Sequence, residues 1–164
     1  LRFALYDVLD AEALTALPEG PFPPTYGRLD DFDILVVQLS DGRYAKLWLE
    51  PLLGKGFEHI RHIRIGTKVL AFWPYKFLTD PDADTVLRLF ERVVASGKHL
   101  ALMAHFTHPR ELETRAVREA IARIRGTGAV IRTQAPLVRH VNDTAAAWAD
   151  MWRTQVNLGC VPYY

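Results

Sequence analysis

Short apolar runs that end in polar residues and are followed by helical patterns recur along this chain, and this alternation constrains its fold more than any other feature. The runs are continuously apolar over a few residues, as expected for strands that are buried on both faces of a parallel sheet. Five strands are predicted, at residues 33–39, 60–65, 100–104, 129–133 and 160–163. With helices in the connections, the order of elements predicts βα units joined by right-handed crossovers, and therefore an α/β fold.

Helical patterns fill the connections between these strands, at residues 44–53, 80–96 and 114–125 and after residue 143. Asp80 is the predicted N-cap of the second helix, Pro81 its first residue and Gly97 its end. Asn142 or Asp143 is the predicted N-cap of the last helix. The side chains expected to pack between helices and sheet include Leu87, Phe90, Ile121, Trp148, Met151, Trp152 and Val156.

Residues 1–31 are predicted to form an N-terminal segment and linker, and residues 32–164 the α/β domain. The apolar residues of Leu1–Leu17 have a spacing that is acceptable for one face of a helix. Pro18–Gly27 holds four prolines and two glycines, a composition typical of a loop. Neither segment shows residues that suggest chemistry.

Composition excludes several classes of protein. The formal net charge is +1 and the basic residues are not clustered, which argues against a nucleic-acid-binding surface. The longest apolar runs fall far below the ~20 residues of a membrane helix, and no signal peptide is visible at the N-terminus. The single cysteine, Cys160, excludes an intrachain disulfide and a cysteine-rich zinc site. A cytoplasmic protein without a membrane or nucleic-acid partner is therefore expected, while a homo-oligomeric state stays open.

Parallel βα units place the carboxyl ends of all their strands on one rim of the sheet, where ligands bind. Four residues follow strands of different units and are expected to converge there on one cavity: Thr67, His105, Gln134 and Arg139. His105 and His108 are three residues apart, but Pro109 argues against a helix through both, so no metal site is predicted. The structural alternative is that one histidine bonds a neighbouring loop and the other caps the next helix.

Structural alternatives stand beside the ligand interpretation of the other polar residues. Arg64 interrupts an apolar strand, and a buried arginine needs either an acid or a ligand anion. Gln134 needs a partner from a neighbouring strand or from a ligand, because an unpaired buried amide costs ~1–3 kcal/mol. Arg139, Asn142 and Asp143 could serve only to shape the turn and cap the helix.

Four motifs in this order and spacing resemble those of the lysine 2,3-aminomutase family of radical S-adenosylmethionine (SAM) enzymes. Residues 105–109, His-Phe-Thr-His-Pro, match the family's His-Phe-Asn-His-Pro. The other three matches are Ile-Arg-Ile-Gly-Thr-Lys at 63–68, Thr-Gln-Ala-Pro-Leu-Val-Arg-His-Val-Asn-Asp at 133–143, and Val-Pro-Tyr-Tyr at 161–164. The resemblance covers roughly residues 58–164, with a fainter extension to Asp33.

The resemblance implies a partial (βα) barrel of the radical SAM type, with an open, curved sheet and outer helices. It implies an isomerase that moves the amino group of an amino acid substrate by means of a 5′-deoxyadenosyl radical. The implied cofactors are SAM, a 4Fe–4S cluster and pyridoxal phosphate. The implied cofactor-binding residues are His105, which lines the family's SAM pocket, and Gln134, Thr67, Arg64 and Arg139; no catalytic residue or metal ligand is assigned.

Three family features are missing from the chain. It lacks the Cys-x-x-x-Cys-x-x-Cys loop that holds the cluster. Residues 40–42, Ser-Asp-Gly, are an incomplete version of the family's Ser-Gly-Gly-Asp, and the segments that hold pyridoxal phosphate and choose the substrate are absent. The chain is therefore expected to be a fragment, joined pieces of a longer protein, or a degenerate homologue. The alternative function is a non-catalytic α/β domain that binds a nucleoside-like ligand or a partner protein.

Overall fold

One open sheet of six parallel strands forms the centre of the molecule. The computed structural model describes residues 3–7, 34–38 and 49–163. Its strands follow chain order, each pairing with the next in parallel. They are β1 (Phe3–Asp7), β2 (Ile34–Gln38), β3 (His62–Thr67), β4 (His99–His105), β5 (Val130–Gln134) and β6 (Val161–Pro162). The predicted α/β fold with an open parallel sheet is confirmed.

The first strand corrects the prediction for the N-terminal segment. A helical stripe was expected over Leu1–Leu17, but Phe3–Asp7 is a strand that pairs in register with β2. A short apolar run such as Phe-Ala-Leu-Tyr fits a buried strand as well as it fits a helix. In the structure this run pairs with the edge of β2, which makes it a strand and adds a sixth strand to the sheet.

Helices and 3-10 turns connect the strands. They are η3 (Pro51–Leu53), α3 (Val69–Phe72), η4 (Pro74–Phe77), α4 (Ala83–Ala95), η5 (Pro109–Leu112), α5 (Arg115–Gly126) and α6 (Ala145–Asn157). Gly97, Gly128 and Gly159 follow α4, α5 and α6 with φ between 75° and 85°, a left-handed conformation that glycine adopts without strain. The glycines thus end each long helix shortly before the next strand begins.

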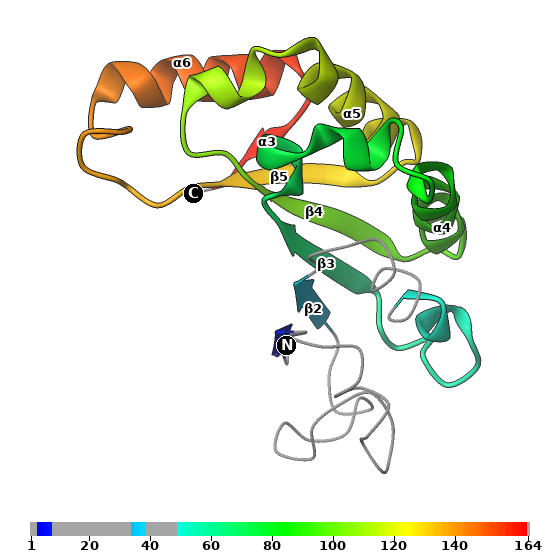
Figure 1. Cartoon of the computed structure of the whole chain (residues 1–164). Helices are drawn as coiled ribbons and strands as arrows, with labels where there is room; N and C mark the ends of the chain where they lie inside the picture. The colour runs from blue at the N-terminus through cyan, green and yellow to red at the C-terminus, as the bar shows by residue number, and fades with distance from the viewer. Residues whose placement is uncertain (1–2, 8–33, 39–48, 164) are drawn as a thin grey trace.

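All the long helices that the structure describes lie on one side of the sheet. Parallel strands in chain order with right-handed crossovers place every connection on the same face, as in a (βα) barrel. Figure 1 shows α3, α5 and α6 together on one side of β3–β5, with α4 beside β4 on that same flank. The opposite side of β3–β6 is called here the helix-free face, because no described helix covers it. The outer strands β1 and β6 each pair on one side only, so the sheet does not close.

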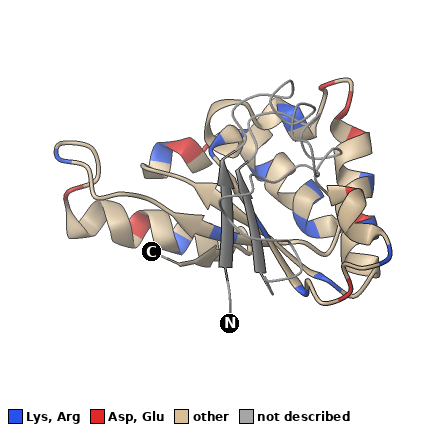
Figure 2. Cartoon of the chain, turned by 90° about the horizontal axis from the view of Figure 1, so that it is seen from below, with Lys and Arg blue, Asp and Glu red and all other residues tan. Residues whose placement is uncertain are grey.

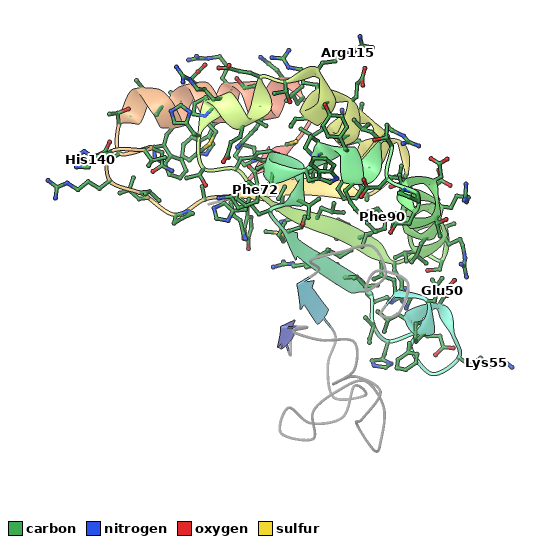
Figure 3. The ribbon with its side chains drawn as sticks, viewed as in Figure 1. Glu50, Lys55, Phe72, Phe90, Arg115 and His140 are labelled. Carbon is green, nitrogen blue, oxygen red and sulfur yellow. The ribbon has the colours of Figure 1, made fainter. Side chains whose placement is uncertain are left out.

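The core lies between the sheet and these helices. Alternate side chains of the strands, such as Ile63, Leu102 and Ile131, are buried against Phe90 of α4 and Ile121 of α5. Figure 3 shows Phe90 between its helix and the strands. The predicted burial of Leu87, Phe90 and Ile121 is confirmed.

Helix α6 presents a different face from the one predicted. Met151 and Gln155 are each 1% exposed, whereas Trp152 is 45% and Val156 is 58% exposed, so the expected burial of the last two is wrong. Thr133 of β5 points toward the helix, and its hydroxyl donates to Gln155 Oε1 at 2.7 Å. With this buried polar pair, the face that α6 turns toward the sheet is shifted by about one residue from the face that hydrophobicity alone predicts.

Helix α4 starts two residues later than expected and without a side-chain cap. Asp82 is the N-cap residue but makes no capping hydrogen bond. Asp80, the predicted cap, instead accepts from Trp73 Nε1 at 3.1 Å and pairs with Lys76 at 3.5 Å. Lys76 also binds Asp82 at 2.5 Å. The acids therefore fix the preceding turn η4 rather than the helix N-terminus.

Several predictions lie wholly or partly outside the described residues. These are the loop at Pro18–Gly27, the incomplete motif at residues 40–42, and residues 44–48 of the first predicted helix. The last residues of that predicted helix, Pro51–Leu53, form the 3-10 turn η3. In the part of the chain that is described, no helix is long and apolar enough to cross a membrane.

Candidate functional site

The carboxyl ends of β4 and β5 bring two of the predicted residues side by side. His105 is the last residue of β4 and pairs in register with Gln134, the last residue of β5. Because the strands are parallel, both residues lie at the same end of the sheet. Their side chains alternate with the buried Ala104 and Thr133, so they belong to the helix-free face.

His105 lies in a positively charged setting. Its Nε2 is 3.2 Å from the hydroxyl of Thr107, which also accepts from Lys68 Nζ at 3.0 Å. Burial lowers the pKa of His105, the charge of Lys68 lowers it further, and Glu111 partly opposes the shift. The imidazole is therefore held toward its neutral form, in which one nitrogen donates and the other accepts.

Gln134 presents a side-chain amide with no hydrogen bond to any described residue. Its backbone carbonyl accepts from Phe106 N–H at 3.2 Å, which ties the ends of β4 and β5 together. The backbone is thus fixed while the amide keeps its donors and acceptor for another group. His105 and Gln134 together offer hydrogen-bonding groups of both kinds at the rim.

His108 caps the helical turn that follows it, which is the structural alternative to ligand binding. Its Nδ1 accepts from Arg110 N–H at 3.2 Å, which caps η5. The Glu111 carboxylate accepts in return from the backbone N–H groups of Thr107 and His108, at 2.5 and 3.3 Å. This reciprocal capping holds the loop that follows β4, directly beside His105.

Asn142 shapes the loop between β5 and α6. It is 1% exposed; its Nδ2 donates to the carbonyls of Thr107 and Pro136, each at 2.9 Å, and its Oδ1 accepts from Val138 N–H at 2.6 Å. The predicted cap is wrong, because Thr144 caps α6 by accepting from Ala147 N–H at 3.2 Å.

Asp143 has a turn-shaping role, accepting from His140 N–H at 2.8 Å. His140 has a φ of 64° in this loop. Arg139 is exposed there, and no described contact joins it to His105 or Gln134. Figure 3 shows the neighbouring His140 at the outer end of the loop, away from the strands.

Thr67 and Arg64 lie on opposite faces of β3. Thr67 lies on the same face of the strand as the buried Ile63 and Ile65. Its hydroxyl accepts from Val69 N–H at 3.1 Å, at the start of α3. Thr67 is thus at the rim, but its hydroxyl bonds the backbone of its own loop. Arg64 is on the helix-free face, with its guanidinium carbon 5.9 Å from the centre of the Tyr163 ring.

Arg132 is a residue that the sequence analysis missed. It lies on β5, two positions before Gln134, with its guanidinium carbon 5.4 Å from the centre of the Tyr163 ring. The signal was present, because Arg132 interrupts an apolar strand just as Arg64 does.

Comparison with known proteins finds relatives whose names agree with the resemblance that the motifs indicate. A putative L-lysine 2,3-aminomutase of Aquifex aeolicus is 38% identical over 107 residues, 65% of this chain. The L-lysine 2,3-aminomutase of Escherichia coli is 27% identical over 117 residues, 71% of the chain. This chain is homologous to the lysine 2,3-aminomutases. A second putative L-lysine 2,3-aminomutase of Aquifex aeolicus is 26% identical over 137 residues. No protein-family model matches the chain.

The match covers only part of each lysine 2,3-aminomutase. The aligned segments span 28%, 31% and 35% of the three relatives, so the chain corresponds to about a third of their length.

The residues present can be tested against the cofactors that lysine 2,3-aminomutase homology implies. A four-iron cluster does not fit, because the 164 residues hold one cysteine, and burial raises the pKa of its thiol to about 11. No group of three or more metal-ligating side chains occurs among the described residues.

Lys98 precedes β4 and Lys68 follows β3, so the two lysines lie at opposite ends of the parallel sheet and do not form one site. Lys98 Nζ donates to the carbonyls of Phe57 and Ile60, at 2.6 and 2.8 Å. Lys68 binds Thr107, as described above. The hydrogen-bonding groups of His105 and Gln134 at the rim are chemically compatible with the polar groups of SAM, and Gln134 has no side-chain partner among the described residues.

Proposed function

We propose that this chain is part of a radical SAM aminomutase and that its rim forms one wall of the SAM site. The observation that carries the proposal is the pairing of His105 with Gln134 at the carboxyl ends of adjacent parallel strands. Homology to proteins named lysine 2,3-aminomutase supports the class of reaction, and an amino acid is the proposed substrate.

The proposed role of the chain's residues is to bind and orient the nucleoside. His105 and Gln134 hydrogen-bond its polar groups, while η5 and Asn142 fix the loops that follow their two strands. When bound with a four-iron cluster whose cysteines lie outside these 164 residues, SAM would supply a radical able to remove a hydrogen atom from the substrate. The proposed isomerase moves an amino group between adjacent carbons of that substrate.

The test uses the full-length protein, reconstituted anaerobically with iron and sulfide and supplied with SAM and a reductant. We expect iron and sulfide in the ratio of a four-iron cluster, reductive cleavage of SAM, and a migrated amino group when L-lysine and other amino acids are offered. SAM binding without a cluster and without cleavage would instead support a non-catalytic nucleoside-binding domain.

A further inference from the structure

Two arginines stand on the helix-free face below the rim. Arg64 of β3 and Arg132 of β5 both place their guanidinium groups within 6 Å of the Tyr163 ring centre. Tyr163 directly follows β6. The two arginines of β3 and β5 and the tyrosine after β6 therefore meet on one side of the sheet.

No described acid neutralises these two cations. Strands β3–β6 contain no aspartate or glutamate, and Figure 2 shows the acidic residues on helices and loops. Arg64 and Arg132 form no ion pair with a described carboxylate. The charges of both arginines contribute to the lowered pKa of His99, which lies on the same face.

Among the described residues, Arg132 has neither a carboxylate partner for its charge nor a partner for one of its donors. Its Nε is buried and has no hydrogen-bond partner among the described residues. A buried Nε–H left unpaired is unfavourable, and a guanidinium without a described counter-ion attracts anions, so this arrangement favours an incoming anion. A guanidinium is also the side chain best shaped to bind carboxylate or phosphate through two hydrogen bonds.

Arg132 lies between the rim and Arg64 along the strands. It is in register with Met103 and Gly66, two positions before the pair formed by His105 and Gln134. Two residues of a parallel strand span roughly 6–7 Å, which is within the reach of one small molecule. A ligand bound at the rim could therefore place an anionic group beside Arg132.

We propose that Arg132, assisted by Arg64, binds the oxyanion of a small ligand whose other end lies at the rim. The oxyanion is a carboxylate or a phosphate. The assignment rests on the proposed function, because it treats the rim as a ligand site, and it adds an anionic group as a requirement for the ligand.

The test measures the melting temperature of the full-length protein without SAM, in acetate, inorganic phosphate or chloride at equal ionic strength. We expect acetate or phosphate at several times its dissociation constant to raise the Tm by roughly 2–4 °C over chloride. The probe with the larger rise identifies the oxyanion. The Arg132→Met variant should lose the rise while melting in chloride no lower than wild type, because the unpaired guanidinium is gone.

Two further variants keep the test decisive. Arg132→Lys retains the charge without the forked donors and should show a smaller rise, and Arg153→Met, on the exposed part of α6, should keep the full rise. If no probe raises the wild-type Tm above chloride and Arg132→Met melts lower, Arg132 pairs with an acid of its own chain and the proposal is wrong. These measurements are made without SAM, so a failure of this proposal can be told apart from a failure of the proposed function.

Discussion

Asn142 is the residue whose side chain holds the β5–α6 loop in place. Its three hydrogen bonds join that loop to itself and to the loop after β4, and it is almost fully buried. Asn142→Ala should lower the free energy of unfolding by about 1–3 kcal/mol, because buried polar groups lose their partners. Urea denaturation measures this loss, and Asn157→Ala, at the exposed end of α6, should change it by less than about 0.5 kcal/mol. Equal losses in the two variants would contradict the account.

His99 should make stability depend on pH. Burial lowers its pKa below 6.5, and His62, Arg132 and Arg64 add to the shift; the rings of His62 and His99 are 5.5 Å apart. Below pH 6.5 the unfolded chain binds a proton that the folded chain resists, so stability present at pH 7.5 should fall as the pH drops.

Urea midpoints between pH 7.5 and 5.5 check this dependence on pH. His99→Gln should reduce the slope of the curve because one titrating group is gone, while His105, whose pKa is also lowered, keeps its own contribution. His62→Gln should flatten it partly, because one repelling neighbour is removed. Three identical slopes for wild type and the two variants would exclude His99 as the source.

Individual side chains were predictable where strand order alone decides their position. His105 and Gln134 end adjacent parallel strands, so their meeting followed from the βα pattern. The partners of Thr67, Asn142 and Thr144 were not predictable, because each bonds a backbone group whose position depends on the exact turn. Arg132 was overlooked although its pattern matched that of Arg64.

At the scale of elements, the contact of α6 with β5 depends on the hydrogen bond from Thr133 to Gln155. Thr133→Val and Gln155→Met should each cost about 1–3 kcal/mol, because each leaves a buried polar partner unpaired. The double variant should cost less than the sum, with a coupling energy of about 0.5–1.5 kcal/mol. Denaturant unfolding of the four proteins measures the cycle, and strict additivity would show that the bond does not set the helix.

The same bond explains why the face of α6 could not be predicted from hydrophobicity. Trp152 and Val156 are more apolar than Gln155, yet the helix buries Gln155. The pattern of α5 was simpler, because Val117, Ile121 and Ile124 face the sheet and Thr114 caps the helix. Apolar periodicity thus located the helices, and a buried polar pair altered the orientation of one of them.

At the scale of the whole molecule, the homology implies a cluster that this chain does not hold. Cys160 is buried, and its pKa is raised to about 11, so it should react slowly with iodoacetamide at pH 8. In the full-length protein, Cys160→Ala should leave the iron content of the reconstituted cluster unchanged. A variant that loses iron would make Cys160 a ligand and contradict the site described here.

The central claim is that the carboxyl ends of β4 and β5 bind SAM, and SAM affinity of the full-length protein tests it most directly. His105→Ala and Gln134→Ala should each weaken binding by about 3–10-fold, the cost of a lost hydrogen bond, with unchanged urea midpoints. Arg153→Ala, on the exposed part of α6, should bind SAM as wild type does. Wild-type affinity in both rim variants, with their stability intact, would show that SAM does not bind at this rim.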